Sequence, residues 1–525
     1  MDIIGKIAGL SRSQAETLRA RMREREALAR GQGVPRIEPD AARQGRPFPL
    51  TESQHGSCAG RQGAAVAGNA CARAYLEIEA CGADLERLER AFNRVIARHG
   101  MLRAVVQADG CQRILADVPY YCFKVEDLFG MPAHERATRL AALRDALSHG
   151  VPPAGSWPRY EVRASRLPEH KLRLHLAFDR LVLDARSIDL LSADWQHYHD
   201  HPAHEPAPLA FSFADYEAGL CQMERTRAFQ DALHYWRGRL GDLPPPAFAS
   251  ARGPEPAATP ACTHRSLRLP RGDWDALKKR AGALGIMPTA LLLSIYGGVV
   301  RRWSQSPCFT LQLAQCGRLP FHPDAERMLG NFTTATLLAF DFSMPRPFAE
   351  LALCLQRQLW QDLDQGAVGG VRVLRELAGR QGSVESDAPA GTMPVVFTSA
   401  LDDSGASHGG AAPFDWLGHT AYAVTQTPQV WLDCQAREYG GDLAIDWDSA
   451  DALLGHGVVD GMFDAFTGML QRLARDSAAW HTARPDLVAP LQDTPMAPAH
   501  AAEMPVPAGV LRGQAAEAWP AVSLR

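Results

Sequence analysis

A strand that ends in an acidic loop constrains the fold of this chain more than any other feature. Residues 172–178 alternate large apolar side chains with polar or small ones, which predicts a strand with one buried face. The alternation stops at Asp179, and a helical pattern resumes over residues 190–199. The loop between them therefore lies at the end of a strand, where side chains that carry chemistry are commonly placed.

The rest of the chain alternates helical and strand patterns, as an α/β protein does. Helices are predicted over residues 83–99, 274–284 and 289–303. A crossing over residues 241–261, rich in Pro and Gly, divides the chain into two halves. The predicted organisation comprises a helix and tether over 1–46, a first lobe over 47–240, a second lobe over 241–484 and a mobile tail over 485–525.

The N-terminal segment is charged and opens with a Ser13-x-x-Glu16 capping box. Two interpretations stay open for its helix: a solvated leader, or a docking element for a partner enzyme.

Composition excludes several classes of protein. A chain of 525 residues, 46% of them hydrophobic, can bury a large core, and a formal net charge of -4 gives no electrostatic reason to expect nucleic acid or a membrane surface. No apolar run approaches the ~20 residues of a membrane span, and the N-terminus lacks the features of a secretory signal. The 11 cysteines never form a CxxC pair, which favours reduced thiols in the cytoplasm.

Other conspicuous residues do not indicate a site. The histidines between a helix end and a Pro-rich loop lack a carboxylate or cysteine complement, so no metal is expected. They are His197, His199, His201 and His204. The paired glycines lack a phosphate-binding fingerprint, and no GxSxG elbow of a hydrolase is present.

The loop at residues 179–187 reads DRLVLDARS. Asp179 and Asp184 would lie about 140° apart on a helix, so they do not form a pair on one helical face. Ser187 begins the following helix, where its hydroxyl can cap or stabilise the first turn. Alone, the DxxxxDxxS spacing is a weak signal.

Further motifs follow in a fixed order around this loop. They are FPLTESQ at 48–54 with GR at 60–61, RHGMLRAV at 98–105, LGNFT at 329–333, PVVFTS at 394–399, QTPQVWLD at 426–433 and WD at 447–448. From residue 48 to about residue 473, the series closely resembles the heterocyclization domains of nonribosomal peptide synthetases, a branch of the condensation-domain family.

The resemblance implies an α/β fold of two chloramphenicol-acetyltransferase-like lobes, arranged as a V-shaped pseudo-dimer around a central tunnel. Ordinary condensation domains carry two adjacent histidines in this loop, followed by three free positions and Asp-Gly. Here the pair is Asp179-Arg180, and Ala185 replaces the glycine. The histidine that positions the amine for amide formation is thus absent, which indicates the cyclising branch.

The resemblance also implies roles for single residues. Asp184 is expected to be structural and ion-paired with Arg103, whereas Asp179 either shapes the loop or takes part in chemistry. Asp433 matches the acidic residue that shuttles a proton during cyclodehydration, and Thr398 matches the hydroxyl that orients it. Without the motif, Asp433 would be interpreted as a surface carboxylate at a strand end. The candidate catalytic set is Asp433, Thr398, Asp179, Asp184 and Ser187, and the candidate structural or tunnel residues are Arg103, Asn331, Thr333 and Gln429.

Two positions depart from the family pattern. Many relatives have Asn-Arg-x-Pro where this chain reads GRLP at 317–320, and Asn331 stands where they have an aspartate. The Thr398 and Asp433 pair is kept, but the amide that assists cyclisation in relatives is replaced by Gly317.

The resemblance implies condensation of a carrier-bound acyl, aryl or peptidyl thioester with carrier-bound Cys, Ser or Thr, followed by cyclodehydration to a thiazoline or oxazoline, as in peptide or siderophore biosynthesis. The expected partners are donor and acceptor carrier proteins and adenylation enzymes. The chain needs no cofactor, because the phosphopantetheine arms belong to the carriers.

Two alternatives remain: amide formation without cyclisation, and a catalytically silent scaffold that binds carriers. The N-terminal Met favours a free-standing enzyme over an excised piece of a synthetase; the donor acyl group, the nucleophile and the oligomeric state stay open.

Overall fold

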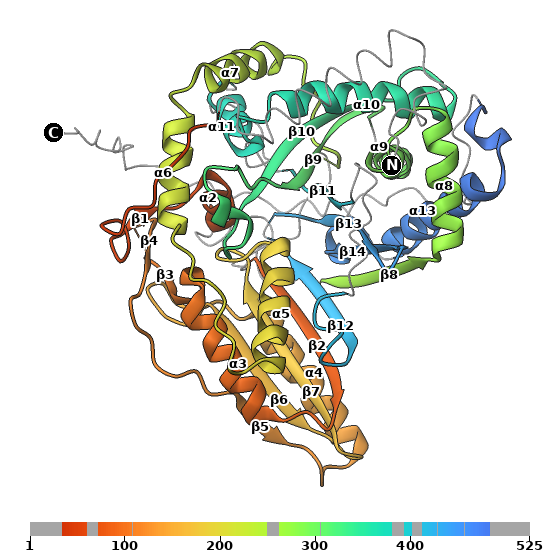
Figure 1. Cartoon of the computed structure of the whole chain (residues 1–525). Helices are drawn as coiled ribbons and strands as arrows, with labels where there is room; N and C mark the ends of the chain where they lie inside the picture. Colours follow the sequence, from red (N-terminus) through yellow and green to blue (C-terminus); the bar gives the residue numbers. More distant parts are fainter. Residues whose placement is uncertain are drawn as a thin grey trace, which may run out of the picture.

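The computed structural model describes residues 34–59, 72–107, 109–248, 262–304, 306–380, 393–401, 412–427, 429–455 and 457–482. Two lobes, each built on its own β-sheet, lie one below the other in Figure 1. The α/β class predicted from the sequence is confirmed. The helix predicted before residue 31 and the tail after residue 484 lie outside the described residues.

The sheet of the first lobe has five strands and is mostly antiparallel. Its order is β12 (His419–Gln426), β2 (Arg73–Cys81), β7 (Lys171–Asp179), β6 (Tyr160–Arg166) and β5 (Lys124–Asp127). Strand β7 confirms the alternation read at 172–178, and it ends at Asp179 as predicted.

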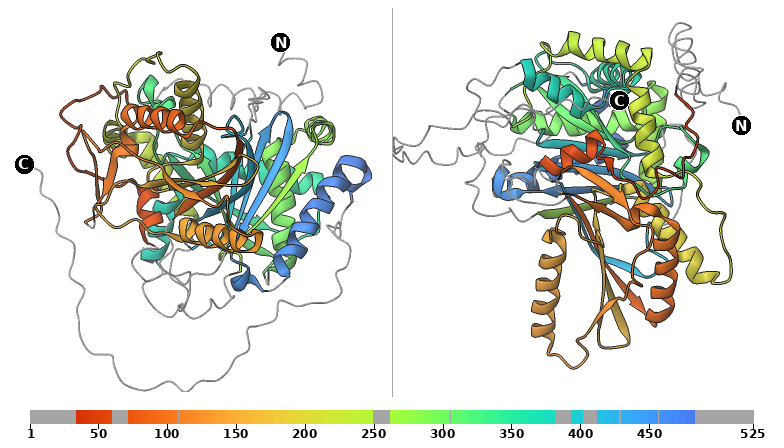
Figure 2. Two further views of the ribbon diagram at one scale, coloured as in Figure 1. Left: turned by 90° about the horizontal axis from the view of Figure 1, so that it is seen from below. Right: turned by 90° about the vertical axis from the view of Figure 1, so that its left-hand side faces the viewer.

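Helices cover both faces of this sheet, with α3 and α5 on one face and α4 on the other (Figure 2). Helix α3 begins after Asp84, whose side chain accepts the N–H of Arg87, and it buries a stripe that includes Phe92. The helical segments are α3 (Leu85–Arg98), the 3-10 turn η2 (Gly100–Arg103), α4 (Ala133–His149) and α5 (Ala185–Asp200). A small sheet of β1 (Phe48–Pro49), β4 (Cys111–Ile114) and β3 (Ala104–Val106) lies beside them.

The second lobe has a mixed sheet of six strands. Their order is β10 (Thr333–Asp341), β9 (Cys308–Cys316), β11 (Val395–Ala400), β13 (Leu432–Tyr439), β14 (Asp442–Ser449) and β8 (Thr263–Leu269). Alternate side chains of the central strands, such as Phe397, Cys434 and Trp447, enter a large apolar core under the helices. The residues between them point to the opposite face, and this face carries the candidate site.

The helices that build this core lie together at the upper right of Figure 1. They are α8 (Arg271–Ala283), α9 (Pro288–Trp303), α10 (Phe348–Asp364) and α13 (Val458–Arg475). The remaining helical segments are α2 (Glu52–Ala59), α6 (Phe213–Met223), α7 (Arg227–Arg239), η3 (Pro323–Glu326), α11 (Gly370–Arg380), α12 (Asp451–Leu454) and η4 (Ala478–Trp480).

Segments cross between the lobes in both directions. Strand β12 belongs by sequence to the second half, but it pairs with β2 of the first sheet from Gln426 opposite Arg73 to His419 opposite Glu79. In return, Phe229 and Trp236 of α7 pack with Leu337 of β10. A division of the chain at residue 240 therefore does not coincide with a division between the two sheets.

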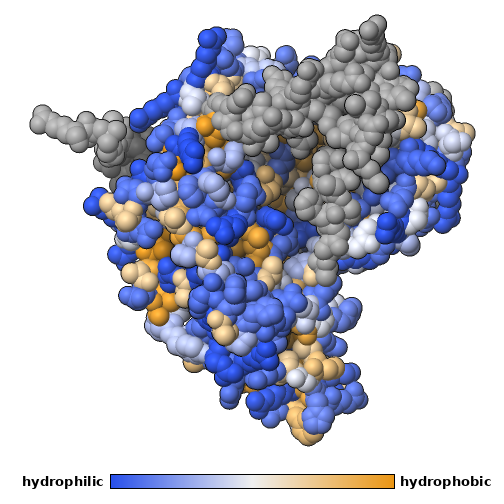
Figure 3. All heavy atoms as spheres, viewed as in Figure 1, coloured by the Kyte–Doolittle hydropathy of each residue, from blue (hydrophilic) through white to orange (hydrophobic). Residues whose placement is uncertain are grey.

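No single helix in the described ranges combines the length and apolar character that a membrane crossing requires. The pair α8 and α9 passes such a test jointly, but the two helices are bent by 98° relative to each other and their apolar faces are buried in the core. Polar side chains predominate on the face of the lower lobe in Figure 3, with apolar ones scattered among them. The cytoplasmic location stays a prediction.

Candidate active site

Asp179 is bound within its own lobe. Its carboxylate forms an ion pair with Arg159 at 2.5 Å, and both side chains are almost fully buried. The other carboxylate oxygen accepts the backbone N–H of Leu181 at 2.9 Å. The sequence left two roles open for Asp179, shaping the loop or taking part in chemistry. These contacts support the first role.

Asp184 links the loop to the second lobe. It is the N-cap of α5, because it accepts the N–H of Ser187 at 2.6 Å, and its other oxygen accepts the N–H of Phe332 at 3.1 Å. Its cationic partner is Arg318, at 3.5 Å, and both side chains are buried. Asp184 thus stabilises the start of a helix and an interlobe contact at once.

The predicted ion pair between Asp184 and Arg103 is wrong. Arg103 instead donates to the carbonyl oxygens of Ile96, Ala97 and Leu115. Two of these carbonyls end helix α3, where no further helical N–H reaches them. The arginine therefore caps a helix C-terminus within the first lobe.

Ser187 extends the same contact, and Asp184 rather than Ser187 caps the helix. The Ser187 hydroxyl donates to the carbonyl of Gly330 at 2.7 Å and accepts the N–H of Gly330 at 3.0 Å. Arg318 donates to the same hydroxyl at 2.9 Å, and the amide of Asn331 donates to the carbonyl of Arg180 at 2.9 Å. We call Asp184, Ser187, Arg318 and Asn331 the interlobe clasp.

Thr398 and Asp433 lie next to each other, as predicted. Thr398 on β11 donates its hydroxyl to Asp433 on β13 at 3.2 Å. The register of the two parallel strands places Thr398 opposite Gln435, whose amide donates to Asp433 at 3.0 Å. Two donors from two strands therefore hold one carboxylate.

A second carboxylate lies directly across the sheet. Asp448 on β14 is the antiparallel partner of Asp433, and the amide of Gln435 donates to it as well, at 3.2 Å. His264 is the next residue in the row, on β8, and its Nδ1 lies 2.8 Å from Asp448. We call Asp433, Gln435, Asp448 and His264 the carboxylate row; β13, β14 and β8 lie side by side in Figure 1.

Burial dominates the electrostatics of this row. It raises the pKa of Asp433 to about 6, repulsion from Asp448 adds to the rise, and Arg180, Thr398 and Gln435 oppose it. Burial also raises the pKa of Asp448, although His264 opposes this. Desolvation disfavours the imidazolium of His264, but the hydrogen bond and the charge of Asp448 outweigh it and raise the pKa of His264. Asp433 can therefore both give and take a proton near neutral pH.

Arg180, in the loop of the first lobe, interacts electrostatically with Asp433 of the second. Burial lowers its pKa, and the charge of Asp433 acts in the opposite direction. The loop thus presents a cation to Asp433 at the position where ordinary condensation domains carry a histidine.

The profile of the condensation domain matches residues 48–480. The chain belongs to the condensation-domain family. It is 36% identical to pyochelin synthetase PchF of Pseudomonas aeruginosa over 92% of this chain and 26% of that protein, and 33% identical to phenyloxazoline synthase MbtB of a Mycobacterium species over 86% of this chain and 37% of that protein. The chain thus spans about a quarter to about a third of the length of these curated relatives.

Solved structures assign the chain to the cyclization branch of the family. The EpoB cyclization-docking bidomain of a nonribosomal peptide synthetase from Sorangium cellulosum is 33% identical, with a TM-score of 0.78 over 90% of this chain and 94% of that one. The first condensation domain of the calcium-dependent antibiotic synthetase, 19% identical with a TM-score of 0.66 over 85% of this chain and 100% of that one, shares the fold. The predicted two-lobed, chloramphenicol-acetyltransferase-like fold is confirmed.

Thr333 and Gln429 are the remaining candidates of this heterocyclization domain. The carbonyl of Thr333 accepts the hydroxyl of Ser53, and Gln429 adopts a left-handed backbone conformation, with φ of 68°, between β12 and β13. Neither observation places Gln429 in a tunnel, so that role stays a prediction. Gln54 of the first motif donates to the carbonyl of Leu181, within the loop, at 2.8 Å.

Three important residues were missed by reasoning from the sequence. Gln435 was detectable, because it follows Asp433 by two positions and so faces the same side of its strand. Arg318 lies in the GRLP segment at 317–320 that the sequence singled out, but its contact with Asp184 was not predicted. His264 lies far from Asp448 along the chain, and no spacing signal marks it.

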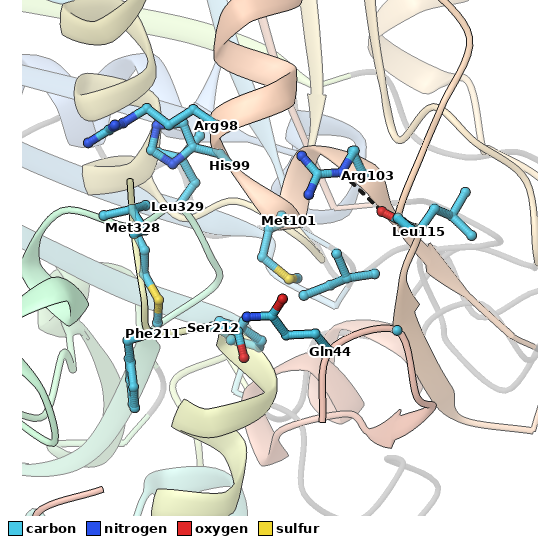
Figure 4. A pocket seen from close by; sticks show the side chains of 16 residues that line it. Gln44, Arg98, His99, Met101, Arg103, Leu115, Phe211, Ser212, Met328 and Leu329 are labelled. Atoms are coloured by element: carbon cyan, nitrogen blue, oxygen red, sulfur yellow. Dashed lines mark hydrogen bonds between the residues drawn. The ribbon is translucent and has the colours of Figure 1, made fainter. Parts of the chain in front are cut away.

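A cavity lies away from the carboxylate row, beside the end of α3 (Figure 4). Arg98, His99 and Arg103 line it together with apolar side chains such as Met101 and Phe211. His99 is held by Asp194 at 2.7 Å. Within the described ranges, no group of three or more His, Cys, Asp or Glu side chains is arranged to hold a metal ion.

Proposed function

We propose that this domain joins a carrier-bound acyl, aryl or peptidyl thioester to a carrier-bound Cys, Ser or Thr, and then closes the side chain on the new amide to give a thiazoline or oxazoline. The setting is nonribosomal peptide or siderophore biosynthesis. The names of the relatives PchF and MbtB, a pyochelin synthetase and a phenyloxazoline synthase, support this assignment. Its partners are carrier proteins and adenylation enzymes, and the phosphopantetheine arms arrive with the carriers.

The observation that carries the proposal is the buried Asp433 held by Thr398. In the first step, the acceptor amine attacks the donor thioester, the C–N bond forms, and the donor carrier leaves as a thiol. The acceptor thiol or hydroxyl then adds to the amide carbonyl, and the S–C or O–C bond that forms leaves a hydroxyl on the former carbonyl carbon. Asp433 gives its proton to this hydroxyl, which leaves as water.

The amide nitrogen then loses its proton to the Asp433 carboxylate as the C=N bond forms. One carboxyl group therefore acts first as acid and then as base, which requires a pKa near neutrality. Asp433, with a pKa raised to about 6, meets this requirement. Thr398 and Gln435 fix its orientation.

Mass spectrometry of carrier-bound products tests the proposal. Donor and acceptor carriers loaded with benzoyl and cysteinyl groups are mixed with the domain, and the acceptor is weighed. An amide that has lost one water supports cyclisation, an intact amide supports condensation alone, and unchanged carriers support a silent scaffold.

The Asp433→Asn variant tests whether Asp433 is the acid and base of ring closure. It keeps the shape of the side chain but cannot give a proton, so the uncyclised amide should accumulate, with ring formation slowed by a factor of about 10²–10⁴. Glu86→Gln, on the exposed surface of α3, is the matched control. Ring formation at the normal rate in Asp433→Asn would contradict the assignment.

Condensation without cyclisation is a second candidate, favoured by Gly317. The resemblance implies an asparagine here in many relatives, and a Cβ at this position would lie 2.2 Å from Cγ2 of Thr334. The backbone is thus packed for glycine, and no side-chain amide reaches the substrate from this point.

A further inference from the structure

The two carboxylates of the row receive unequal sets of donors. Asp433 accepts the Thr398 hydroxyl and one N–H of Gln435. Asp448 accepts the other N–H of Gln435, the backbone N–H of Thr425 at 3.0 Å and Nδ1 of His264 at 2.8 Å. Asp448 therefore receives more donors than Asp433, and His264, whose pKa this contact raises, adds a positive charge when it is protonated. Both effects stabilise the ionised form of Asp448.

Gln435 fixes the geometry of this pair. Arg437 lies 3.3 Å from its amide oxygen, so the amide nitrogen points toward both carboxylates. Because Asp433 and Asp448 are direct cross-strand partners, ionising both places two negative charges side by side in a buried site. Such pairs hold one proton between them.

We infer that His264 and Asp448 form a positioning pair that keeps this shared proton on Asp433, where it is available to protonate the leaving hydroxyl. The inference rests on the proposed function and deepens it. His264 does not contact the reacting atoms in this scheme. It acts through Asp448, and its partly exposed ring lets its charge equilibrate with solvent.

Other charged groups surround the row and act on its protons. Arg180 favours the ionised form of Asp433, and so opposes the placement of the proton there. Asp446 adds negative charge near both His264 and Asp448. Further titratable or charged neighbours include Arg268 on β8, Tyr422 on β12, Cys262 before β8, Arg437 and Cys434 on β13 and Tyr296 on α9. Asp448 alone among these groups is the direct cross-strand partner of Asp433.

Removing the imidazolium should reverse the order in which the two carboxylates bind the shared proton. Without it, Asp448 takes the shared proton, and Asp433 gains its own only at lower pH. His264→Gln keeps a hydrogen-bond donor but no charge, whereas His264→Lys restores a cation. A purely structural hydrogen bond would be preserved in the Gln variant, so the two variants separate charge from shape.

The pH profile of ring closure gives the first readout, taken as the ratio of cyclised to uncyclised carrier product. The basic limb should move by about one pH unit to lower pH in His264→Gln, a roughly tenfold loss at pH 7. His264→Lys should keep the wild-type midpoint, as should the control Arg268→Gln, which removes an exposed cation from the same strand. An unshifted Gln variant, or a Lys variant shifted equally, overturns the inference.

Neutron diffraction gives a readout that needs no activity. In crystals at about pH 5, deuterium should lie on Asp433 in the wild-type protein and on Asp448 in His264→Gln. Deuterium on Asp448 in the wild type, on neither carboxylate, or unmoved in the variant overturns the inference. If the wild-type domain forms no ring, the proposed function fails, and the neutron result still decides the placement of the proton.

Discussion

Asp433 is buried at the cost of stability, and this cost depends on pH. Its pKa of about 6 lies above the ordinary 3.8, so the folded protein binds this proton more tightly than the unfolded chain does. The contribution of Asp433 to stability is therefore fully present below pH 4 and is lost as the pH rises through 6. Asp433→Asn should stabilise the fold by about 3 kcal/mol at pH 8, and by about half of that at pH 5.

Melting temperatures of the wild-type and Asp433→Asn proteins at both pH values check this prediction. Asp442→Asn, at the exposed start of β14, serves as the control. A stabilisation that is equal at pH 5 and pH 8 would show that the amide improves packing rather than removing a buried charge.

Substitution of Asp184 should have the opposite effect and destabilise the fold, because the charge of Asp184 is compensated by Arg318. Asp184→Ala leaves the buried Arg318 without its carboxylate and removes the cap of α5. The expected loss is about 3–5 kcal/mol. Glu86→Ala breaks an exposed pair with Arg90, at 3.6 Å, and should cost less than about 1 kcal/mol. Thermal denaturation compares the two, and equal losses would exclude an energetic role for the clasp.

At the residue scale, short motifs predicted one contact of the site correctly and another wrongly. The contact of Thr398 with Asp433 was predicted from two motifs 35 residues apart, and the structure confirms it. The partner of Asp184, which the resemblance implied to be Arg103 of the RHGMLRAV motif, was predicted wrongly, because a shared motif does not fix which arginine reaches a given carboxylate. Only the path of the chain brings Arg318, rather than Arg103, to Asp184.

At the scale of elements, periodicity predicted what is local. Strand β7 and helices α3, α8 and α9 agree with their patterns to within a few residues. Helix α5 starts at Ala185, two residues before the predicted start at Ser187 and five before the apolar pattern at 190–199, because Asp184 caps it. Strand β12 could not be assigned to the first sheet, since its alternation fixes a buried face but not a partner strand.

The end of strand β9 gives a prediction at this scale. An asparagine at Gly317 would force its Cβ against Thr334 on β10, whose own Cβ lies 2.9 Å from that position. Gly317→Asn should therefore destabilise the domain by about 1–3 kcal/mol without improving ring closure.

Thr334→Gly removes the obstructing side chain. The double variant should recover stability relative to Gly317→Asn, although Thr334→Gly alone costs about 1 kcal/mol. Melting temperatures of the three variants form the test. Absence of recovery in the double variant would place the steric conflict elsewhere.

At the scale of the whole molecule, the site is divided between the lobes. The carboxylate row belongs to the second sheet, whereas Arg180 and the clasp residues Asp184 and Ser187 come from the first. Strand β12 contacts both lobes, because it pairs with β2 of the first sheet and the N–H of its Thr425 donates to Asp448 of the second. The geometry of the row therefore depends on the first lobe staying folded.

This dependence predicts that a substitution that destabilises the first lobe also increases hydrogen exchange in the second. Leu176 is fully buried in the first core, opposite Leu76 of β2, so Leu176→Ala should cost about 2–5 kcal/mol. Hydrogen exchange should accelerate in peptides of β13 and β14 as well as in β2 and β7, because β12 and the clasp transmit the loss. Phe129→Ala, at a side chain that is 63% exposed, should change neither set. Faster exchange confined to the first lobe would mean that the two lobes open independently, and that the carboxylate row keeps its geometry without the first sheet.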